Sequence, residues 1–395
     1  MLEMTLANLF NYKYLDKHHL NGFDNYKYSS VDTNPIGIYV MHPFWNKLVE
    51  YFPRWLAPNL ITFVGFLFTV LSFVWLSFYD YHYYASSLTH PNYPPVPKWL
   101  FSLVGICVFL AYTLDGIDGK QARRTGNSGP VGELFDHGLD SWTAMFVPAL
   151  LYSIFGRSDF SVSPFRMYLI CWNVFISFYA SHWEKYNTGV LYLPWSYDLS
   201  MLGTTVVFWV TGYYGIEFWK VYLYRDITLG HLLEITFYVS SFISNLPVVI
   251  YNIYHSYKTG TGKNRPLLEA MRPLYPLVAF VALSYYWVRT SPNDIMDLDP
   301  RAVFITTGTI FSNICCRLIV AQMSNTRCDA FNWLLVAQAV DIVLSSFFVG
   351  MPRAELCLLY VFCTVALLAH IHYGSCVVRQ MCKHFKIRVF KIKHK

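Results

Sequence analysis

The chain has 395 residues, of which 55% are hydrophobic, 19% aromatic and only 14% charged. Soluble globular domains carry about 25% charged residues, so this composition excludes an ordinary soluble domain and indicates a membrane protein. The formal net charge of +6 could suggest a nucleic-acid partner, but the basic residues gather on one side of the predicted membrane topology, and we therefore expect no nucleic-acid binding.

Residues 1–55 form an N-terminal segment that lacks an apolar run long enough to span a membrane and lacks the apolar core of a signal peptide. Within it, the stretch IYVMHPFWNKLVEYF at 38–52 interleaves aromatic, aliphatic and basic residues. This pattern is typical of an amphipathic helix that lies in the membrane interface. A loop facing water is the alternative.

Ten apolar stretches follow this segment, and a helix needs about 20 apolar residues to cross a membrane. They cover residues 58–79, 99–116, 138–156, 165–183, 199–218, 229–254, 270–289, 302–323, 331–349 and 354–378. Backbone polar groups in lipid must be paired within the segment, and these stretches lack the alternation of barrel strands. We expect an all-α polytopic membrane protein with one membrane domain over 56–378.

An even number of spans places both termini on one side of the membrane. If that side is cytosolic, it collects most of the 30 Lys and Arg residues, as the positive-inside rule requires. The remaining segment, 379–395, is a basic tail in which Lys391 and Lys393 match a dilysine retrieval signal. Binding of the tail to acidic lipid headgroups is the alternative. We expect a protein of the endoplasmic reticulum or Golgi membrane.

Four carboxylates crowd the cytosolic ends of the second and third spans, in the stretch LDGIDGKQARRTGNSGPVGELFDHGLDSW at 114–142. Asp115 and Asp118 are three residues apart, and Asp136 and Asp140 are four apart, so each pair shares one helical face. The glycines and the proline between the pairs let the chain reverse. The two helices therefore present four carboxylates to each other at the membrane boundary.

Four anionic carboxylates cannot share a partly dry site unless some are protonated or cations neutralise them. A set of oxygen ligands without a Cys or His cage favours Mg²⁺ or Mn²⁺, and two such ions are the usual clamp for displacement at phosphorus. The alternative is that the aspartates pair with Lys120, Arg123 and Arg124 as solvated loop charges. Small residues beside the carboxylates either let nucleotide phosphates approach the backbone or allow close helix packing, and both can hold. These small residues are Gly116, Gly119, Ala122 and Gly132.

The same stretch resembles the motif of the CDP-alcohol phosphotransferase family, D-x2-D-G-x2-A-R-x8-G-x3-D-x3-D, at every fixed position. The resemblance implies a helical, usually dimeric membrane enzyme that transfers a phospho-substituent from a CDP-linked donor to an alcohol and releases CMP. It also implies two divalent metals held by Asp115, Asp118, Asp136 and Asp140.

Other stretches, including NPIGIYVMHPFWN (34–46), SHWEKYNTG (181–189) and LAHIHYG (368–374), are similar to the eukaryotic choline/ethanolamine phosphotransferases, and most of all to the members that use ethanolamine. The reaction implied is transfer of phosphoethanolamine from CDP-ethanolamine to diacylglycerol, giving phosphatidylethanolamine and CMP. Choline or dual specificity is the close alternative. A multi-span transporter is the alternative from another class, and it predicts functional charges near the bilayer midplane rather than at its edge.

The resemblance also implies roles for individual residues. His137 is expected to take the proton from the acceptor hydroxyl, with Asp140 as the alternative base. Lys120 or Arg123 would stabilise the CMP leaving group, and Gln121 and Glu133 would contact the donor. Asn59 resembles a contact to cytidine, with a helix N-cap as the alternative. The predicted substrate-binding set is Asn59, Gly119, Lys120, Gln121, Ala122, Arg123, Gly132 and Glu133.

Five further polar residues lie inside predicted spans, where ionisable groups are usually functional or paired. We expect Arg317 and Asp341, on consecutive spans, to form an ion pair. Glu234, His370 and His372 are expected to line the diacylglycerol entry or a dimer contact.

Overall fold

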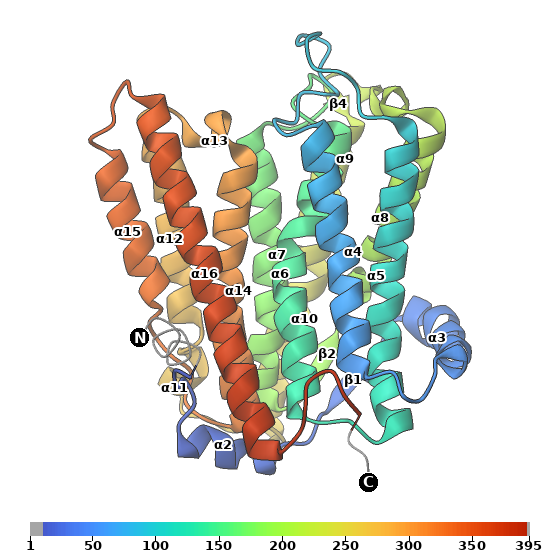
Figure 1. Ribbon diagram of the computed structural model, residues 1–395, viewed down its shortest axis with the longest axis vertical. Coiled ribbons are helices and arrows are strands. Elements are labelled where there is room, and N and C mark those ends of the chain that lie inside the picture. The colour runs from blue at the N-terminus through green and yellow to red at the C-terminus, as the bar shows by residue number, and fades with distance from the viewer. Residues whose placement is uncertain (1–10, 393–395) are drawn as a thin grey trace, which may run out of the picture.

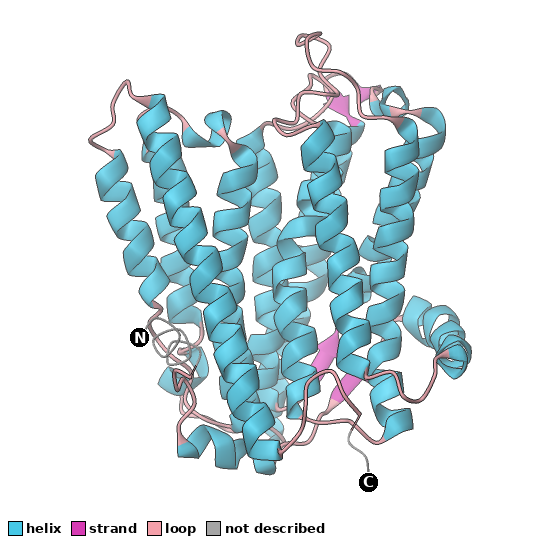
Figure 2. Ribbon diagram, viewed as in Figure 1, coloured by secondary structure: helices cyan, strands magenta, loops and turns pink. Residues whose placement is uncertain are grey.

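Helices make up nearly all of the ordered structure in the computed structural model, which describes residues 11–392 (Figure 1; Figure 2). The long helices are α4 (Pro58–Tyr79), α5 (Lys98–Thr125), α6 (Pro130–Phe155), α7 (Pro164–Thr188), α8 (Trp195–Tyr214), α9 (Leu229–Val239) continued by η4 (Ser240–Asn245) and α10 (Leu246–Thr259), α12 (Leu274–Thr290), α14 (Pro300–Ser324), α15 (Trp333–Ser345) and α16 (Pro352–Phe385). Shorter helical pieces are α2 (Lys17–Asp24), η1 (Gly37–Met41), α3 (His42–Leu48), η2 (Val49–Tyr51), η3 (Ile216–Trp219), α11 (Leu267–Met271) and α13 (Ile295–Leu298). The short strands are β1 (Ser30–Asp32), β2 (Leu191–Leu193), β3 (Tyr222–Tyr224) and β4 (Ile227–Thr228). The predicted all-α class is confirmed.

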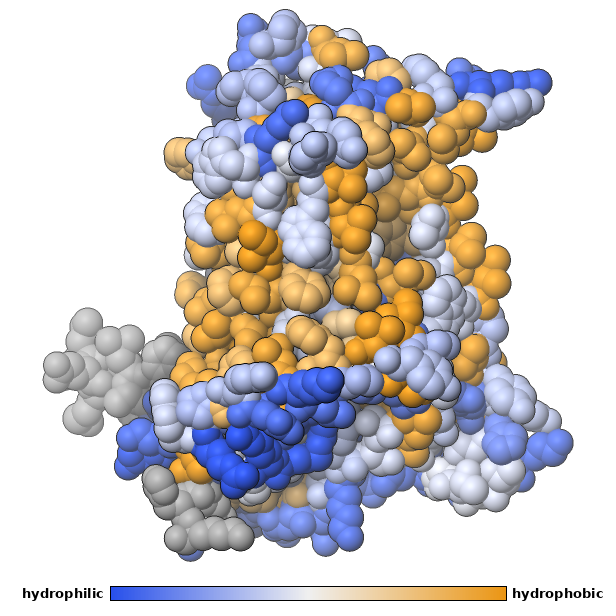
Figure 3. Space-filling model, turned by 90° about the vertical axis from the view of Figure 1, so that its right-hand side faces the viewer, coloured by the Kyte–Doolittle hydropathy of each residue, from blue (hydrophilic) through white to orange (hydrophobic). Residues whose placement is uncertain are grey.

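Each of the ten predicted spans coincides with a helix, and the long helices run side by side along the long axis of the molecule (Figure 1). Within the described residues, six helices are long and apolar enough to cross a membrane by length and composition. They are Pro58–Tyr79, Lys98–Thr125, Leu229–Thr259, Leu267–Thr290, Pro300–Ser324 and Pro352–Phe385. A hydrophobic band also separates two hydrophilic ends on the face shown in Figure 3. The protein is therefore a multi-pass membrane protein, and the count of ten spans stays a prediction.

Helix α14 forms the centre of the bundle, with α4, α5 and α8 on one side and α12, α15 and α16 on the other (Figure 1). Almost all of its side chains are buried, and many are small or carry a hydroxyl. The hydroxyls of Thr306 and Thr307 donate to the backbone carbonyls one turn earlier, which satisfies them inside an apolar surrounding. Small residues let neighbouring helix backbones approach closely, and Gly308 packs directly against Met145 of α6.

The two helices that carry the aspartates extend further than their hydropathy predicts. Helix α5 continues to Thr125 and ends at Gly126, whose φ of 68° is the left-handed conformation that glycine adopts readily. Helix α6 begins at Pro130, where the fixed φ of proline suits a first helical turn. Only residues 126–129 join them, so the aspartates lie on two antiparallel helices and not in a loop.

The predicted amphipathic stretch 38–52 is helical, as η1, α3 and η2, and lies beside the bundle (Figure 1). The loop alternative is wrong. Trp45 of α3 packs against Gly116 of α5, where an added Cβ would come within 2.2 Å of the indole. The guanidinium of Arg124 donates to the carbonyls of Val49 and Phe52 at 2.7 and 2.6 Å. A small residue and a charged residue of α5 thus hold this stretch in place.

The predicted ion pair between Arg317 and Asp341 is wrong. Arg317 instead pairs with Asp329, with 2.9 Å between Nη1 and Oδ2, because the loop after α14 brings Asp329 within reach. The buried Oδ1 of Asp341 has no hydrogen-bond partner among the described residues.

The other polar residues of the spans also have partners, and their predicted place at the diacylglycerol entry or at a dimer contact stays a prediction. Glu234 pairs with Arg166 of α7. His370 is buried against Trp142 and its Nε2 lies 3.2 Å from the Ser312 hydroxyl. The His372 ring lies 2.9 Å from the Tyr14 hydroxyl and so contacts the N-terminal segment.

Both ends of the described chain lie at the same end of the bundle (Figure 1). Strand β1 pairs in parallel with β2, so the N-terminal segment crosses beneath α7 and α8. Lys393, the second lysine of the predicted retrieval signal, lies outside the described residues.

Candidate active site

A cavity of about 560 Å³ lies between α4, α5, α6, α7, α8 and the N-terminal segment. Most of the residues predicted from the sequence line it: Asn59, Asp115, Asp118, Gly119, Ala122, Arg123, Gly132, Glu133, Asp136, His137 and Asp140. The topology therefore brings both halves of the motif, on α5 and α6, and the start of α4 to one cavity.

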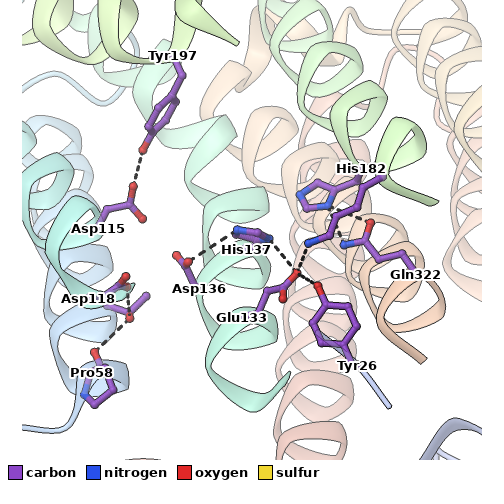
Figure 4. A network of polar contacts seen from close by, with 12 residues as sticks. Tyr26, Pro58, Asp115, Asp118, Glu133, Asp136, His137, His182, Tyr197 and Gln322 are labelled. Atoms are coloured by element: carbon purple, nitrogen blue, oxygen red, sulfur yellow. Dashed lines mark hydrogen bonds and ion pairs between the residues drawn. The ribbon is translucent and has the colours of Figure 1, made fainter. Parts of the chain in front are cut away.

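Three of the predicted acidic ligands converge in this cavity. One carboxylate oxygen each from Asp115, Asp118 and Asp136 lies within 4.8 Å of the others. Asp140 lines the same cavity one turn further along α6. Two hydroxyl groups orient the cluster: the Tyr197 hydroxyl donates to Asp115 Oδ2 at 2.8 Å, and the Thr62 hydroxyl donates to Asp118 Oδ2 (Figure 4).

This acidic cluster fits a hard divalent cation. In the described part of the chain, no Lys or Arg forms an ion pair with Asp115, Asp118 or Asp136, so the alternative of solvated loop charges is wrong for these three carboxylates. Asp136 Oδ1 is also buried without a hydrogen-bond partner. A buried carboxylate oxygen without a donor is costly unless a cation or proton satisfies it. Oxygen-only ligands are the set that Mg²⁺ and Mn²⁺ prefer.

His137 lies between the acidic cluster and a second polar group (Figure 4). Its Nε2 is 3.8 Å from Asp136 Oδ2 and its Nδ1 is 3.9 Å from Glu133 Oε1. Both distances exceed a normal hydrogen bond, so neither carboxylate fixes the orientation of the ring. The ring of His182 packs edge-on against it, with centroids 5.2 Å apart.

Glu133 belongs to a buried ion pair. Its Oε1 pairs with the Lys185 ammonium of α7 and accepts a hydrogen bond from the Tyr26 hydroxyl at 2.7 Å. The same ammonium lies 4.6 Å from the centroid of the Tyr28 ring, which adds a cation–π contact. Burial raises the pKa of Tyr26 and of Tyr28, so both phenols stay protonated. This group fixes the N-terminal segment over the cavity.

The small residues of this stretch differ in what surrounds them. Gly116 allows the packing of Trp45, whereas a Cβ at Gly119 or Gly132 would meet only the far end of one side chain, Arg123 or Asn59 respectively. Gly119 and Gly132 therefore leave backbone open to the cavity. The N-cap of α4 is Ala57, so the N-cap alternative for Asn59 is wrong.

The structure does not bring Lys120 or Gln121 into the cavity. Lys120 Nζ donates to Asn46 Oδ1 at 2.8 Å. Gln121 Nε2 donates to the carbonyls of Pro53 and Leu56 at 2.9 and 3.0 Å. Helical phasing explains this, because both side chains lie on the face of α5 that holds the N-terminal segment. Both side chains hold the N-terminal segment, and their predicted contacts with substrate stay a prediction.

Sequence reasoning missed several residues of the cavity, namely Tyr26, Tyr28, Thr62, His182 and Tyr197. It also missed Lys185, which pairs with the cavity residue Glu133. Lys185 and His182 carried a usable signal, because ionisable residues inside an apolar helix are rare and usually functional. The tyrosines and Thr62 carried none, since such residues are common in membrane proteins.

The fold and the cavity together define a multi-pass membrane protein with a carboxylate cluster suited to divalent metal, located between helices at one end of the bundle.

Comparison with known proteins narrows this class of protein. The family model described as CDP-alcohol phosphatidyltransferase matches residues 55–230. The chain is 47% identical to ethanolaminephosphotransferase 1 of Homo sapiens, over 97% of this chain and 95% of that protein, and 46% identical to ethanolaminephosphotransferase 1 of Mus musculus over the same shares. It is 30% identical to choline/ethanolaminephosphotransferase 1 of Arabidopsis thaliana, over 97% of this chain and 99% of that protein. The chain belongs to the CDP-alcohol phosphotransferase family, as the motif indicated.

Proposed function

We propose that this protein transfers phosphoethanolamine from CDP-ethanolamine to diacylglycerol, giving phosphatidylethanolamine and CMP. The proposal rests on the acidic cluster and on the cavity that holds it. This cavity extends from one end of the bundle to apolar residues between the helices. The near full-length similarity to two ethanolaminephosphotransferases supports the choice of donor.

Two Mg²⁺ or Mn²⁺ ions would be held by the four carboxylates of Asp115, Asp118, Asp136 and Asp140. When bound, such ions neutralise the diphosphate of the donor and make its phosphorus a better electrophile. Arg123 lines the cavity and is placed to stabilise charge on the departing CMP.

His137 is the proposed general base. The Glu133 carboxylate near Nδ1 favours a proton on that nitrogen, which leaves Nε2 to accept the proton of the glycerol hydroxyl as that oxygen attacks phosphorus. Asp140 is the alternative base, one turn further along α6.

The lipid acceptor has a separate route to the cavity. Beyond the aspartates, the cavity extends between α7 and the α9–η4 segment, where Val174, Phe178 and Phe237 line it. This part lies among the membrane-spanning helices, so an apolar diacylglycerol can enter laterally while a charged donor enters from water. Both requirements place the reaction at the membrane boundary.

The aromatic residues near Glu133 favour ethanolamine over choline. A quaternary ammonium is recognised by open aromatic faces, but the Lys185 ammonium already lies over the rings of Tyr26 and Tyr28. Dual specificity is the second candidate, because the relative from Arabidopsis thaliana carries both substrates in its name.

The remaining proposals concern membrane topology, cellular location, oligomeric state and domain bounds. The basic loops favour a cytosolic active site with both termini cytosolic, in the endoplasmic reticulum or Golgi membrane. We also propose a homodimer, a single membrane domain over 56–378, and a cytosolic or interfacial segment before it and a basic tail after it.

The proposal is tested with purified protein, Mg²⁺ or Mn²⁺, diacylglycerol and either CDP-ethanolamine or CDP-choline, with CMP release as the readout. We expect faster release with CDP-ethanolamine, and none from Asp136→Ala, which should still fold. CMP release that does not depend on diacylglycerol, or turnover by Asp136→Ala, would contradict the assigned reaction.

A further inference from the structure

The chain after α16 returns to the rim of the cavity. Helix α16 ends at Phe385, and Lys386 has a φ of 54°, a left-handed conformation that reverses the chain. The segment then crosses from the foot of α16 toward the foot of α4 (Figure 1). There the carbonyl of Val389 accepts a hydrogen bond from Asn59 Nδ2 at 3.0 Å. A residue near the end of the chain thus contacts a side chain of the candidate active site.

This contact is anchored on both sides. Before it, the backbone N–H of Ile387 donates to the Cys382 carbonyl at 3.0 Å. After it, the ring of Phe390 packs against Phe63 of α4 and Phe135 of α6, with both centroid distances 5.7 Å. Phe135 directly precedes the proposed metal ligand Asp136. The aromatic cluster therefore ties the tail to both helices that frame Asn59.

The hydrogen bond decides which way the Asn59 amide points. An amide side chain can present either its N–H₂ or its oxygen in a given direction, and its neighbours select one orientation. A backbone carbonyl only accepts, so Val389 selects Nδ2 and turns Oδ1 the other way. Oδ1 lies beside Gly132, where an added Cβ would be 3.4 Å from it. Among residues 11–392, no donor reaches Oδ1, and Asn59 lines the cavity.

We propose that residues 386–390, which we call the tail clamp, position Asn59 as a hydrogen-bond acceptor for the base of the nucleotide donor. Cytosine presents an exocyclic amino group to such an acceptor, whereas uracil presents a carbonyl oxygen at the same position. The tail clamp would therefore favour a cytidine donor over a uridine donor. Val389 and Phe390 are positioning residues that act through Asn59. The inference rests on the proposed function.

Phe390→Ala tests the proposal by removing the anchor while keeping every active-site residue. We expect the KM for CDP-ethanolamine to rise about tenfold, comparable to the loss of one hydrogen bond to a ligand. The kcat and the KM for diacylglycerol should not change. The ratio of kcat/KM for CDP-ethanolamine over UDP-ethanolamine should fall by a similar factor. The control Phe390→Tyr should have the same KM and the same donor preference as the parent, because Phe390 is 42% exposed and leaves room for a hydroxyl.

Two truncations and a double variant separate positioning from general damage. A chain ending at Arg388 loses the clamp and should match Phe390→Ala, whereas a chain ending at Lys391 keeps it and should match the parent. In an Asn59→Ala background, Phe390→Ala should change the KM no further, because coupled residues are not additive. An unchanged KM in Phe390→Ala, or a fully additive effect with Asn59→Ala, would overturn the tail clamp. Absence of CMP release by the parent protein with either donor would instead overturn the proposed function.

Discussion

Lys185 and Glu133 are the charged residues on which the geometry around His137 depends. Both side chains are nearly inaccessible, with 2% and 6% exposure, and they form an ion pair between α7 and α6. Removing one partner of a buried pair leaves an uncompensated charge, which costs more than the pair itself contributes. The Tyr26 hydroxyl on the same carboxylate oxygen extends that dependence to the N-terminal segment.

Lys185→Met is expected to destabilise the protein by about 3–5 kcal/mol, because it leaves the Glu133 carboxylate buried without its cation. Glu133→Gln in the same chain should recover much of that loss. Thermal unfolding in detergent measures both effects. Arg327→Met is the matched control, since its pair with Glu269 is exposed to solvent. Equal unfolding temperatures for Lys185→Met and the control would show that the pair is unimportant.

Replacing the candidate bases one at a time separates their roles. His137→Ala should lower kcat by about 10²–10⁴-fold, the usual contribution of a general base, while binding of Mg²⁺ survives. Asp140→Ala should lose turnover and also weaken Mg²⁺ binding, because it is a proposed ligand. CMP release and the effect of Mg²⁺ on unfolding temperature give the two readouts. His384→Ala, which breaks a surface pair with Asp24, is the control. Near-normal turnover by His137→Ala would leave Asp140 as the base.

At the scale of helices, the sequence predicted the parts of the structure that depend on hydropathy. Each apolar stretch coincides with a helix, and both aspartate pairs line one cavity, as their spacing on one helical face predicted. The last turns of α5 and the first turns of α6 could not be predicted from hydropathy, because they are polar. Packing of the N-terminal segment stabilises them. The partners of Lys120 and Gln121 could not be predicted, because the motif gives their position in the chain but not the face of α5 that the N-terminal segment covers. The ion pair of Arg317 with Asp329, in place of Asp341, could not be predicted, because the conformation of the loop after α14 sets the distance between Arg317 and Asp329.

The packing of α3 on α5 can be tested at one glycine. Gly116→Ala places a Cβ about where the Trp45 indole lies, and overpacking of this kind typically costs 1–3 kcal/mol. We expect a lower unfolding temperature and reduced turnover. Gly203→Ala is the control, because a Cβ on that residue of α8 meets nothing within 4 Å and alanine favours a helix. A second change, Trp45→Phe, should partly rescue Gly116→Ala. If both glycine variants behave alike, the contact does not hold α3 in place.

At the scale of the whole molecule, distant parts of the chain meet at one end of the bundle. The N-terminal segment reaches the cavity through Tyr26 and Tyr28, and the tail reaches it through Val389. The acidic cluster joins α5 to α6 in the same place. Carboxylates that repel one another destabilise this end of the bundle until cations neutralise them. Metal binding and stability of the fold should therefore be linked.

This linkage predicts that Mg²⁺ raises the unfolding temperature of the protein and that a chelator lowers it. A ligand that binds only the folded state at 100 times its Kd adds about 2.7 kcal/mol of stability. Asp118→Asn removes one charge and one ligand from the cluster, so the metal-free variant should be more stable than the metal-free parent and should respond less to Mg²⁺. Asp297→Asn, at a pair with Arg157 outside the cavity, should respond as the parent does. An equal response to Mg²⁺ in parent and Asp118→Asn would mean that the ion acts elsewhere, since an ion held by the cluster would be bound more weakly once one of its ligands and one charge are removed.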